Sequence, residues 1–311
     1  MIEVKSLSKR YGDLVAVDGI SFSVEPGQVL GFLGPNGAGK STTMKILAGF
    51  LAPTSGTATV CGFDVQEQPI EAKKRIGYLP EGAPSYGEMT PRSFLEFIAD
   101  IRGLVGEQRA ARIADVVERL HLKGVMAQPI ETLSKGFKRR VGLAQAILHD
   151  PPVLILDEPT DGLDPNQKHE VRALINTMAR DKIIVISTHI LEEVHAVCNR
   201  AIVIAEGRLL ADETPAGLEA RSRYHKAVSL TARDPQAVRQ ALTALPEVAS
   251  VEIDPQDERI TAFPRHGKAI FEPISSMLRE RGFAFDELEL ERGRLDEVFR
   301  QITTEGEEAR A

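Results

Sequence analysis

The eight residues that follow a short apolar segment constrain this chain more than any other part of its sequence. They read Gly34-Pro35-Asn36-Gly37-Ala38-Gly39-Lys40-Ser41, between a predicted strand at 29–33 and a predicted helix at 42–50. The spacing G-x-x-x-x-G-K-[ST] is typical of loops that bind phosphate, because the glycines let successive backbone N–H groups turn toward an anion. The N-terminus of the helix adds a partial positive charge. Strand, loop and helix occur in the required order, so a glycine-rich turn that binds nothing is the weaker interpretation.

The two side chains that end this loop carry the predicted chemistry. Lys40 is expected to reach the β- and γ-phosphates of a bound triphosphate, and the hydroxyl of Ser41 is expected to bind Mg²⁺. We therefore predict that the chain binds a nucleoside triphosphate together with a metal ion.

Composition narrows the remaining choices. The 311 residues are enough for one α/β domain of about 200 residues and a smaller companion. Lys and Arg number 38 against 45 Asp and Glu, a net charge of -7, which disfavours a protein that covers nucleic acid with a wide basic face. The only cysteines, Cys61 and Cys198, are expected to be buried free thiols of a reducing compartment. No apolar run approaches the roughly 18 residues that cross a bilayer, and the first residues do not resemble a secretory signal. We expect a cytoplasmic chain that reaches a membrane only through a partner.

Carboxylates follow apolar strands at two places. Segment 75–79 leads through Pro80 to Glu81, and the continuous apolar run 153–156 leads to Asp157 and Glu158. Parallel α/β sheets bind ligands at these strand ends, and two buried carboxylates are costly without a nearby cation. Magnesium bound to phosphates would supply that charge. A further apolar strand at 183–186 ends near His189.

The remaining patterns predict the domain organisation. Short alternating segments at 2–4, 14–17, 20–24 and 57–60 predict an antiparallel layer, with Tyr11 on a loop. Helical periods at 90–150 predict a helical insert, in which Ser134 caps a helix and Gly136 lies in its first turn, a second candidate anion site. A polar segment at 212–223 marks a boundary. The predicted domains are a nucleotide-binding domain at 1–215, a linker at 216–224, a ferredoxin-like β-α-β-β-α-β accessory domain at 225–304 and a disordered tail at 305–311.

Five motifs in order resemble those of a known family. They are the loop 34–41, Leu-Ser-Lys-Gly-Phe at 133–137, the strand with its two carboxylates at 153–158, Gly-Leu-Asp at 162–164, and His189. This arrangement resembles the ATPase subunits of ATP-binding cassette (ABC) transporters over roughly residues 1–215. The segment 295–299 is similar to the end of cassettes that serve exporters of drugs, polysaccharides and gliding-motility systems. The fold class implied is α/β: a P-loop NTPase cassette with an antiparallel β layer and a helical insert, plus a small α+β C-terminal domain.

The resemblance implies a role for each matching residue. Tyr11 stacks on adenine, Glu158 polarises the attacking water, and His189 fixes that water and the γ-phosphate. Asp157 binds Mg²⁺ through water, and Glu81 is a further metal ligand beside Ser41. The phosphates of ATP are held by Gly34, Pro35, Asn36, Gly37, Ala38, Gly39, Lys40, Ser41 and Thr42. The nucleotide is sandwiched between two cassettes, and the second cassette contributes Ser134, Lys135, Gly136 and Asp164.

The same resemblance implies the partners. They are a second copy of the same or a similar cassette and a multi-span membrane permease subunit that docks on the insert 90–150. The chain would then lie on the inner face of the cell membrane, and no nucleic acid is expected.

Two positions depart from the family pattern. Family members commonly have Leu-Ser-Gly-Gly-Gln where this chain has 133–137, and commonly Gln in place of Glu81. Lys135 adds positive charge beside a phosphate, whereas Glu81 adds negative charge. We expect the two changes to offset one another.

Three alternatives to a transport ATPase stay open at this point. A degenerate site that binds but does not hydrolyse is one, although Glu158 and His189 are both present. A cassette ATPase acting on nucleic acid or the ribosome is another, although the chain has neither a long heptad run nor an internal duplication. A small GTPase or kinase fits less well, because no Asn-Lys-x-Asp segment occurs.

Overall fold

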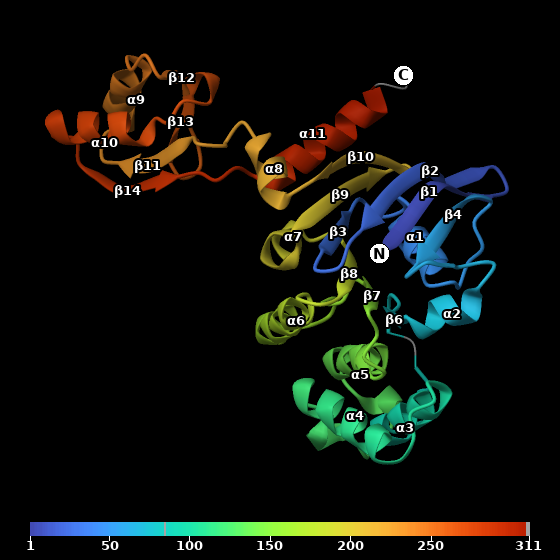
Figure 1. Ribbon diagram of the computed structural model, residues 1–311. Helices are drawn as coiled ribbons and strands as arrows, with labels where there is room; N and C mark the ends of the chain where they lie inside the picture. Colours follow the sequence, from blue (N-terminus) through green and yellow to red (C-terminus); the bar gives the residue numbers. More distant parts are fainter. Residues whose placement is uncertain (84, 309–311) are drawn as a thin grey trace. The chain divides into compact units, whose positions relative to one another are not determined.

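The computed structural model describes residues 1–83 and 85–308, and the chain divides into two compact units. The first unit is Met1–Glu213 and the second is Thr214–Ala311. Figure 1 labels their elements.

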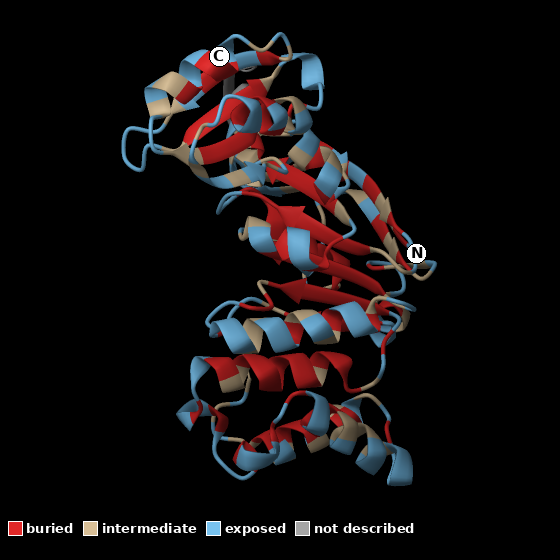
Figure 2. Cartoon of the chain, turned by 90° about the vertical axis from the view of Figure 1, so that its left-hand side faces the viewer, coloured by how far each residue is buried: buried red, intermediate tan, exposed pale blue. Residues whose placement is uncertain are grey.

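A six-stranded sheet forms the centre of the first unit. Its strand order is β10-β9-β3-β8-β7-β6, and all neighbours are parallel except β10, which is antiparallel to β9. The central strands are continuous apolar runs because both faces of the sheet are covered, and they are the red strands in the middle of Figure 2. The strands are β3 (Val29–Leu33), β6 (Ile76–Leu79), β7 (Val153–Asp157), β8 (Ile183–Thr188), β9 (Arg200–Ala205) and β10 (Arg208–Glu213).

An antiparallel layer packs beside this sheet, with helix α1 (Lys40–Leu47) in contact with both. The layer has the order β2-β1-β4-β5. Met44, Ile46 and Leu47 of α1 share one apolar core with residues of both sheets. The layer consists of β1 (Ile2–Tyr11), β2 (Leu14–Val24), β4 (Ser55–Val60) and β5 (Phe63–Asp64).

Helices form the rest of the first unit. Three of them make up the insert, and α5 packs against β6, α3 and α4 (Figure 1). Ser134 caps α5 as expected, because its Oγ accepts a hydrogen bond from the backbone N–H of Phe137 at 3.3 Å. The helices are α2 (Pro69–Lys74), α3 (Pro91–Ile101), α4 (Gly106–Arg119), α5 (Lys135–Ile147), α6 (Pro165–Met178) and α7 (Leu191–Val197). Short 3₁₀ turns occur at Lys123–Val125 and Ile130–Thr132.

The second unit contains an antiparallel sheet with the order β12-β13-β11-β14. Apolar residues of the strands and of helices α9 and α10 make its own core. The elements in chain order are α8 (Pro215–Ala220), β11 (Val228–Ala232), α9 (Pro235–Thr243), β12 (Val248–Ile253), β13 (Ile260–Pro264), a 3₁₀ turn (Arg265–Gly267), α10 (Phe271–Glu280), β14 (Phe285–Leu290) and α11 (Leu295–Glu308).

Four expectations about local structure differ from what is observed. Tyr11 is not on a loop but is the last residue of β1, paired with Leu14 across a tight turn in which Gly12 has a φ of +58°. The predicted linker contains α8, because Thr214 caps it and Pro215 starts it. Helix α11 continues through 308, where a tail was expected, and residues 309–311 lie outside the described part. Both cysteines are free, but Cys61 is only half-buried; burial raises the pKa of Cys198 to about 12.

Candidate nucleotide site

The loop Gly34–Ser41 joins the end of β3 to the start of α1 in the geometry that an anion cradle requires. Gly37 and Gly39 have φ values of +80° and +106°, which glycine adopts without strain. A Cβ atom at Gly39 would overlap the carbonyl oxygen of Ala16, and one at Gly34 would overlap that of Ile204. These glycines are therefore required by close packing of the loop as well as by its turn.

Two neighbouring segments fix the position of the loop through backbone hydrogen bonds. The backbone N–H of Gly207, in the turn between β9 and β10, donates to the carbonyl oxygen of Ala38 at 2.9 Å. The N–H of Asp18, in β2, donates to the carbonyl oxygen of Gly207 at 2.9 Å. The loop is thus fixed to both sheets before any ligand binds.

A cleft of about 230 Å³ opens in front of the loop. It brings the loop together with Glu81, after β6, and Glu158, after β7. This arrangement was expected from the strand ends alone, since the carboxyl ends of parallel strands share one edge of the sheet. The lining residues are Asn36, Gly37, Gly39, Lys40, Ser41, Thr42, Glu81 and Glu158.

Lys40 is the buried cation of this cleft. Its side chain is tucked into the loop, where Nζ donates to the carbonyl oxygens of Gly34 at 2.7 Å and Pro35 at 3.0 Å. Burial lowers the pKa of Lys40, while Glu158, Asp157 and Glu81 act in the opposite direction. The ammonium group is therefore poorly solvated, and a phosphate that reached it would exchange two neutral carbonyl acceptors for a charged one.

Asp157 is fully buried at the end of β7. Its Oδ1 accepts hydrogen bonds from the hydroxyls of Ser187 and Ser41, the latter at 3.3 Å. Its Oδ2 is buried without a hydrogen-bond partner. An orphaned carboxylate oxygen beside a serine hydroxyl is a donor set that fits Mg²⁺, a hard cation that prefers oxygen ligands and keeps several waters.

Glu158 follows directly and has an unusual backbone. Its φ is +51°, a left-handed conformation that side-chain-bearing residues rarely adopt and that proteins retain at functional sites. The N–H of Glu158 donates to the carbonyl oxygen of Ser187 at 3.0 Å. Its carboxylate lies 2.9 Å from Nδ1 of His189, and because a carboxylate only accepts, the imidazole N–H donates.

Three buried groups support this edge of the sheet although the sequence analysis did not single them out. Ser187 binds Asp157, and Glu193 accepts hydrogen bonds from the hydroxyls of Thr160 and Thr188. The guanidinium group of Arg139 donates to backbone carbonyls at the same strand ends. For Arg139, the sequence shows only an arginine within a helical pattern. The structure is needed to show that this residue lies on the buried face of α5.

Other predicted site residues lie outside the lining of the cleft. Tyr11 is about half exposed, and its ring is 5.2 Å from Nζ of Lys9. Lys135 lies against Gly162, and Gly136 lies against the side chain of Gln167. Asp164 caps α6 by accepting from the N–H of Gln167 at 2.9 Å. Within one chain these residues, together with Ser134, serve local structure.

The fold and the cleft define a P-loop NTPase with a helical insert, as expected. The family described as ABC transporter matches residues 17–161. The Nod factor export ATP-binding protein I of Burkholderia orbicola is 38% identical over 244 residues, which cover 78% of this chain and 80% of that protein. The probable multidrug ABC transporter ATP-binding protein YbhF of Escherichia coli is 39% identical over 223 residues, 71% of this chain, and the match spans only 38% of that protein's length.

A solved structure agrees with these relatives. The ATP-binding subunit of an ABC transporter superposes with a TM-score of 0.67 and 30% identity, over 71% of this chain and 92% of that chain. The chain belongs to the ATP-binding subunits of ABC transporters. Within residues 1–83 and 85–308, the helices are too short or too polar to span a bilayer.

Proposed function

We propose that two copies of this chain close around ATP and hydrolyse it at their interface to power export through a separate membrane permease. One observation carries this proposal. The cleft is lined by Lys40, Ser41 and Glu158, and Ser41 donates to the buried Asp157, yet Ser134, Lys135, Gly136 and Asp164 are not among its lining residues. A site that needs both groups is complete only when a second copy supplies the missing one.

The residues present suggest how the γ-phosphate is attacked. Glu158 polarises a water molecule and accepts its proton, and the hydrogen bond from His189 keeps the carboxylate oriented. Lys40 stabilises the charge that develops on the phosphoryl oxygens. Mg²⁺, held by Ser41, Asp157 and Glu81, would neutralise phosphate charge. In this proposal Tyr11 stacks on adenine, while Gly34, Pro35, Asn36, Gly37, Ala38, Gly39 and Thr42 complete the phosphate cradle.

An apolar groove supports docking of a permease segment. It has a volume of about 690 Å³ and lies between the end of α1, α2 and α3. Phe50, Ile70 and Ile101, which line it, are 64–70% exposed, an unusual apolar patch for a soluble surface. Lys73 and Arg102 add positive charge. A permease bound there would hold the chain on the cytoplasmic face of the membrane.

We also propose that residues 225–304 are a ferredoxin-like accessory domain. The order β-α-β-β-α-β along the chain and the sheet order β12-β13-β11-β14 support this assignment.

A mixing experiment tests the shared site. Lys40→Ala and Ser134→Arg should each abolish hydrolysis alone. In a mixed dimer one site combines Lys40 from one copy with Ser134 from the other, so an equal mixture should recover about one quarter of the wild-type rate. The control is a chain carrying both substitutions, mixed with either single variant, which should recover nothing. Absence of recovery in mixtures shown to contain hybrid dimers would disprove the shared site.

A further inference from the structure

Arg139 lies in the second turn of α5 and has an environment unlike that of the chain's surface arginines. It is 4% exposed, and α5 itself is largely buried. Its guanidinium group donates to three backbone carbonyl oxygens: Nη2 to Asp157 at 2.6 Å, Nη1 to Pro80 at 3.2 Å and Nε to Pro159 at 3.3 Å. A single side chain thus joins the insert to two strand ends of the core sheet.

The bond to Asp157 bears directly on Glu158. The carbonyl of Asp157 and the N–H of Glu158 belong to the same peptide group. Arg139 holds the carbonyl, and the Ser187 carbonyl holds the N–H at 3.0 Å. The orientation of this peptide sets the left-handed φ of +51° at Glu158 and hence the direction in which its carboxylate leaves the backbone. The N–H is also held by the hydroxyl of Ser187 at 3.3 Å, whereas loss of the guanidinium group removes a restraint on the carbonyl side of this peptide.

The bond to Pro80 bears on Glu81 in the same way. Pro80 precedes Glu81, which lines the cleft opposite the phosphate loop. Burial lowers the pKa of Arg139, whereas Asp161, Asp157, Glu158 and Glu81 act to raise it. A guanidinium group stays protonated in proteins, so a fixed positive charge lies where the negative charges of the site converge.

We propose that Arg139 is a positioning residue for hydrolysis: it fixes the Asp157–Glu158 peptide and thereby couples the position of α5 to the carboxylate of Glu158. The inference rests on the proposed role of Glu158. Helix α5 begins at Ser134, the residue expected to meet the nucleotide of the second copy. A shift of this helix start on dimer closure is transmitted through the guanidinium group to the peptide that orients Glu158.

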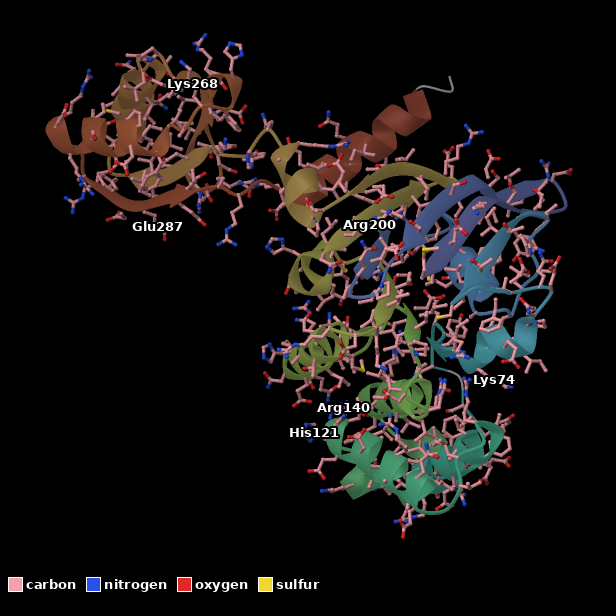
Figure 3. All side chains as sticks on the ribbon, in the orientation of Figure 1. Lys74, His121, Arg140, Arg200, Lys268 and Glu287 are labelled. Carbon is pink, nitrogen blue, oxygen red and sulfur yellow. The ribbon has the colours of Figure 1, made fainter. Side chains whose placement is uncertain are left out.

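The test compares Arg139→Gln with a matched control, Arg140→Gln, in the full-length chain. Arg140 is the next residue on α5 (labelled in Figure 3), is also buried, and bonds Glu170 at 2.9 Å and the carbonyl of Leu120. Arg139→Gln should lower kcat by about 10- to 100-fold, while KM and nucleotide affinity change by no more than about threefold, because misplacement of a reacting group affects the chemical step. Arg140→Gln should leave kcat within about threefold of the wild type, since it contacts neither strand end. Equal losses in the two variants, or a loss confined to KM, would overturn the proposal.

A second measurement asks whether Arg139 acts through Glu158. In the Glu158→Gln background, Arg139→Gln should slow hydrolysis by less than about twofold, since the group it positions is already gone. A full multiplicative loss would contradict the coupling. Arg139→Lys keeps the charge but has a less suitable donor geometry, so its kcat should fall about 3- to 10-fold. This variant takes the place of Arg139→Gln in the test if Arg139→Gln does not fold. Normal hydrolysis by Glu158→Gln would refute the proposed role of Glu158; slow Glu158→Gln with normal Arg139→Gln would refute only this inference.

Discussion

Carboxylates occur in opposite circumstances on two sheets of this molecule. At the end of β7, Asp157 is fully buried, keeps one oxygen without a partner, and is followed by Glu158 in a left-handed conformation. On β14, Glu287 and Glu289 are exposed, and the guanidinium group of Arg259 lies 2.6 Å from Glu289. The second set is neutralised by the chain's own arginine. In the first set a buried carboxylate oxygen has no hydrogen-bond partner, which is costly and is the physical signature of a site completed by a ligand.

The largest expected effect comes from the carboxylates that follow β7. Glu158→Gln keeps the shape of the side chain and an oxygen for His189, but it removes the proton acceptor. We expect kcat to fall by about 10²-fold or more with ATP affinity retained. Phosphate release and equilibrium nucleotide titration measure the two quantities. Glu192→Gln is the control, because Glu192 is an exposed carboxylate paired with Arg172. Full activity in Glu158→Gln would show that Glu158 is not needed for hydrolysis, so the carboxylates that follow β7 would not differ in function from those of β14.

A smaller effect is expected at Asp157. Asp157→Asn removes the negative charge but keeps the hydrogen-bonded Oδ1. The gain in nucleotide affinity caused by Mg²⁺ should shrink about 10-fold, because a hard cation prefers a carboxylate to an amide. Titration with a fluorescent ATP analogue in Mg²⁺ and in EDTA measures the ratio. Asp212→Asn, which removes a carboxylate paired with Arg200 on β9, should leave the ratio unchanged. An unchanged ratio in Asp157→Asn would place the metal elsewhere.

The smallest effect is expected in the neutralised set. Arg259→Gln removes ion pairs whose members are all partly exposed, so the free energy of unfolding of the second unit should fall by less than about 1 kcal/mol. Hydrogen exchange of the β11–β14 amides in increasing urea measures this change. The rate of ATP hydrolysis should not change. A changed rate would mean that the C-terminal sheet contributes to the cleft after all.

The sequence allowed the cleft to be predicted wherever a motif and a strand end coincide. The glycine spacing of the loop 34–41 is typical of phosphate binding. The strands that lead to Glu81 and Asp157 are continuous apolar runs, which predicts that they are buried and parallel. Their carboxylates had to meet at one edge of the sheet. This is why Lys40, Glu81 and Glu158 were expected together and are found lining one cleft.

What was missed has two causes: a contact between segments far apart in the chain for Arg139, and misread local patterns for Tyr11 and the tail. Arg139 lies in a basic run, and only the packing of α5 reveals that its side chain turns inward to Asp157. Tyr11 was placed on a loop because Gly12 suggested one, yet the turn is tight enough for Tyr11 to pair with Leu14. The predicted tail failed because acidic composition outweighed the apolar spacing of Leu295, Val298 and Ile302, which continues the period of a helix.

The turn at Gly207 has a consequence for how this protein can change. Turns between surface strands usually tolerate insertions and deletions. Here, however, Gly207 donates to Ala38 and accepts from Asp18, with no room for a Cβ beside the backbone of β2. A lengthened hairpin would push directly on the phosphate cradle. The turn is therefore structurally part of the nucleotide loop, and an insertion point for a tag or reporter is better chosen in a different hairpin.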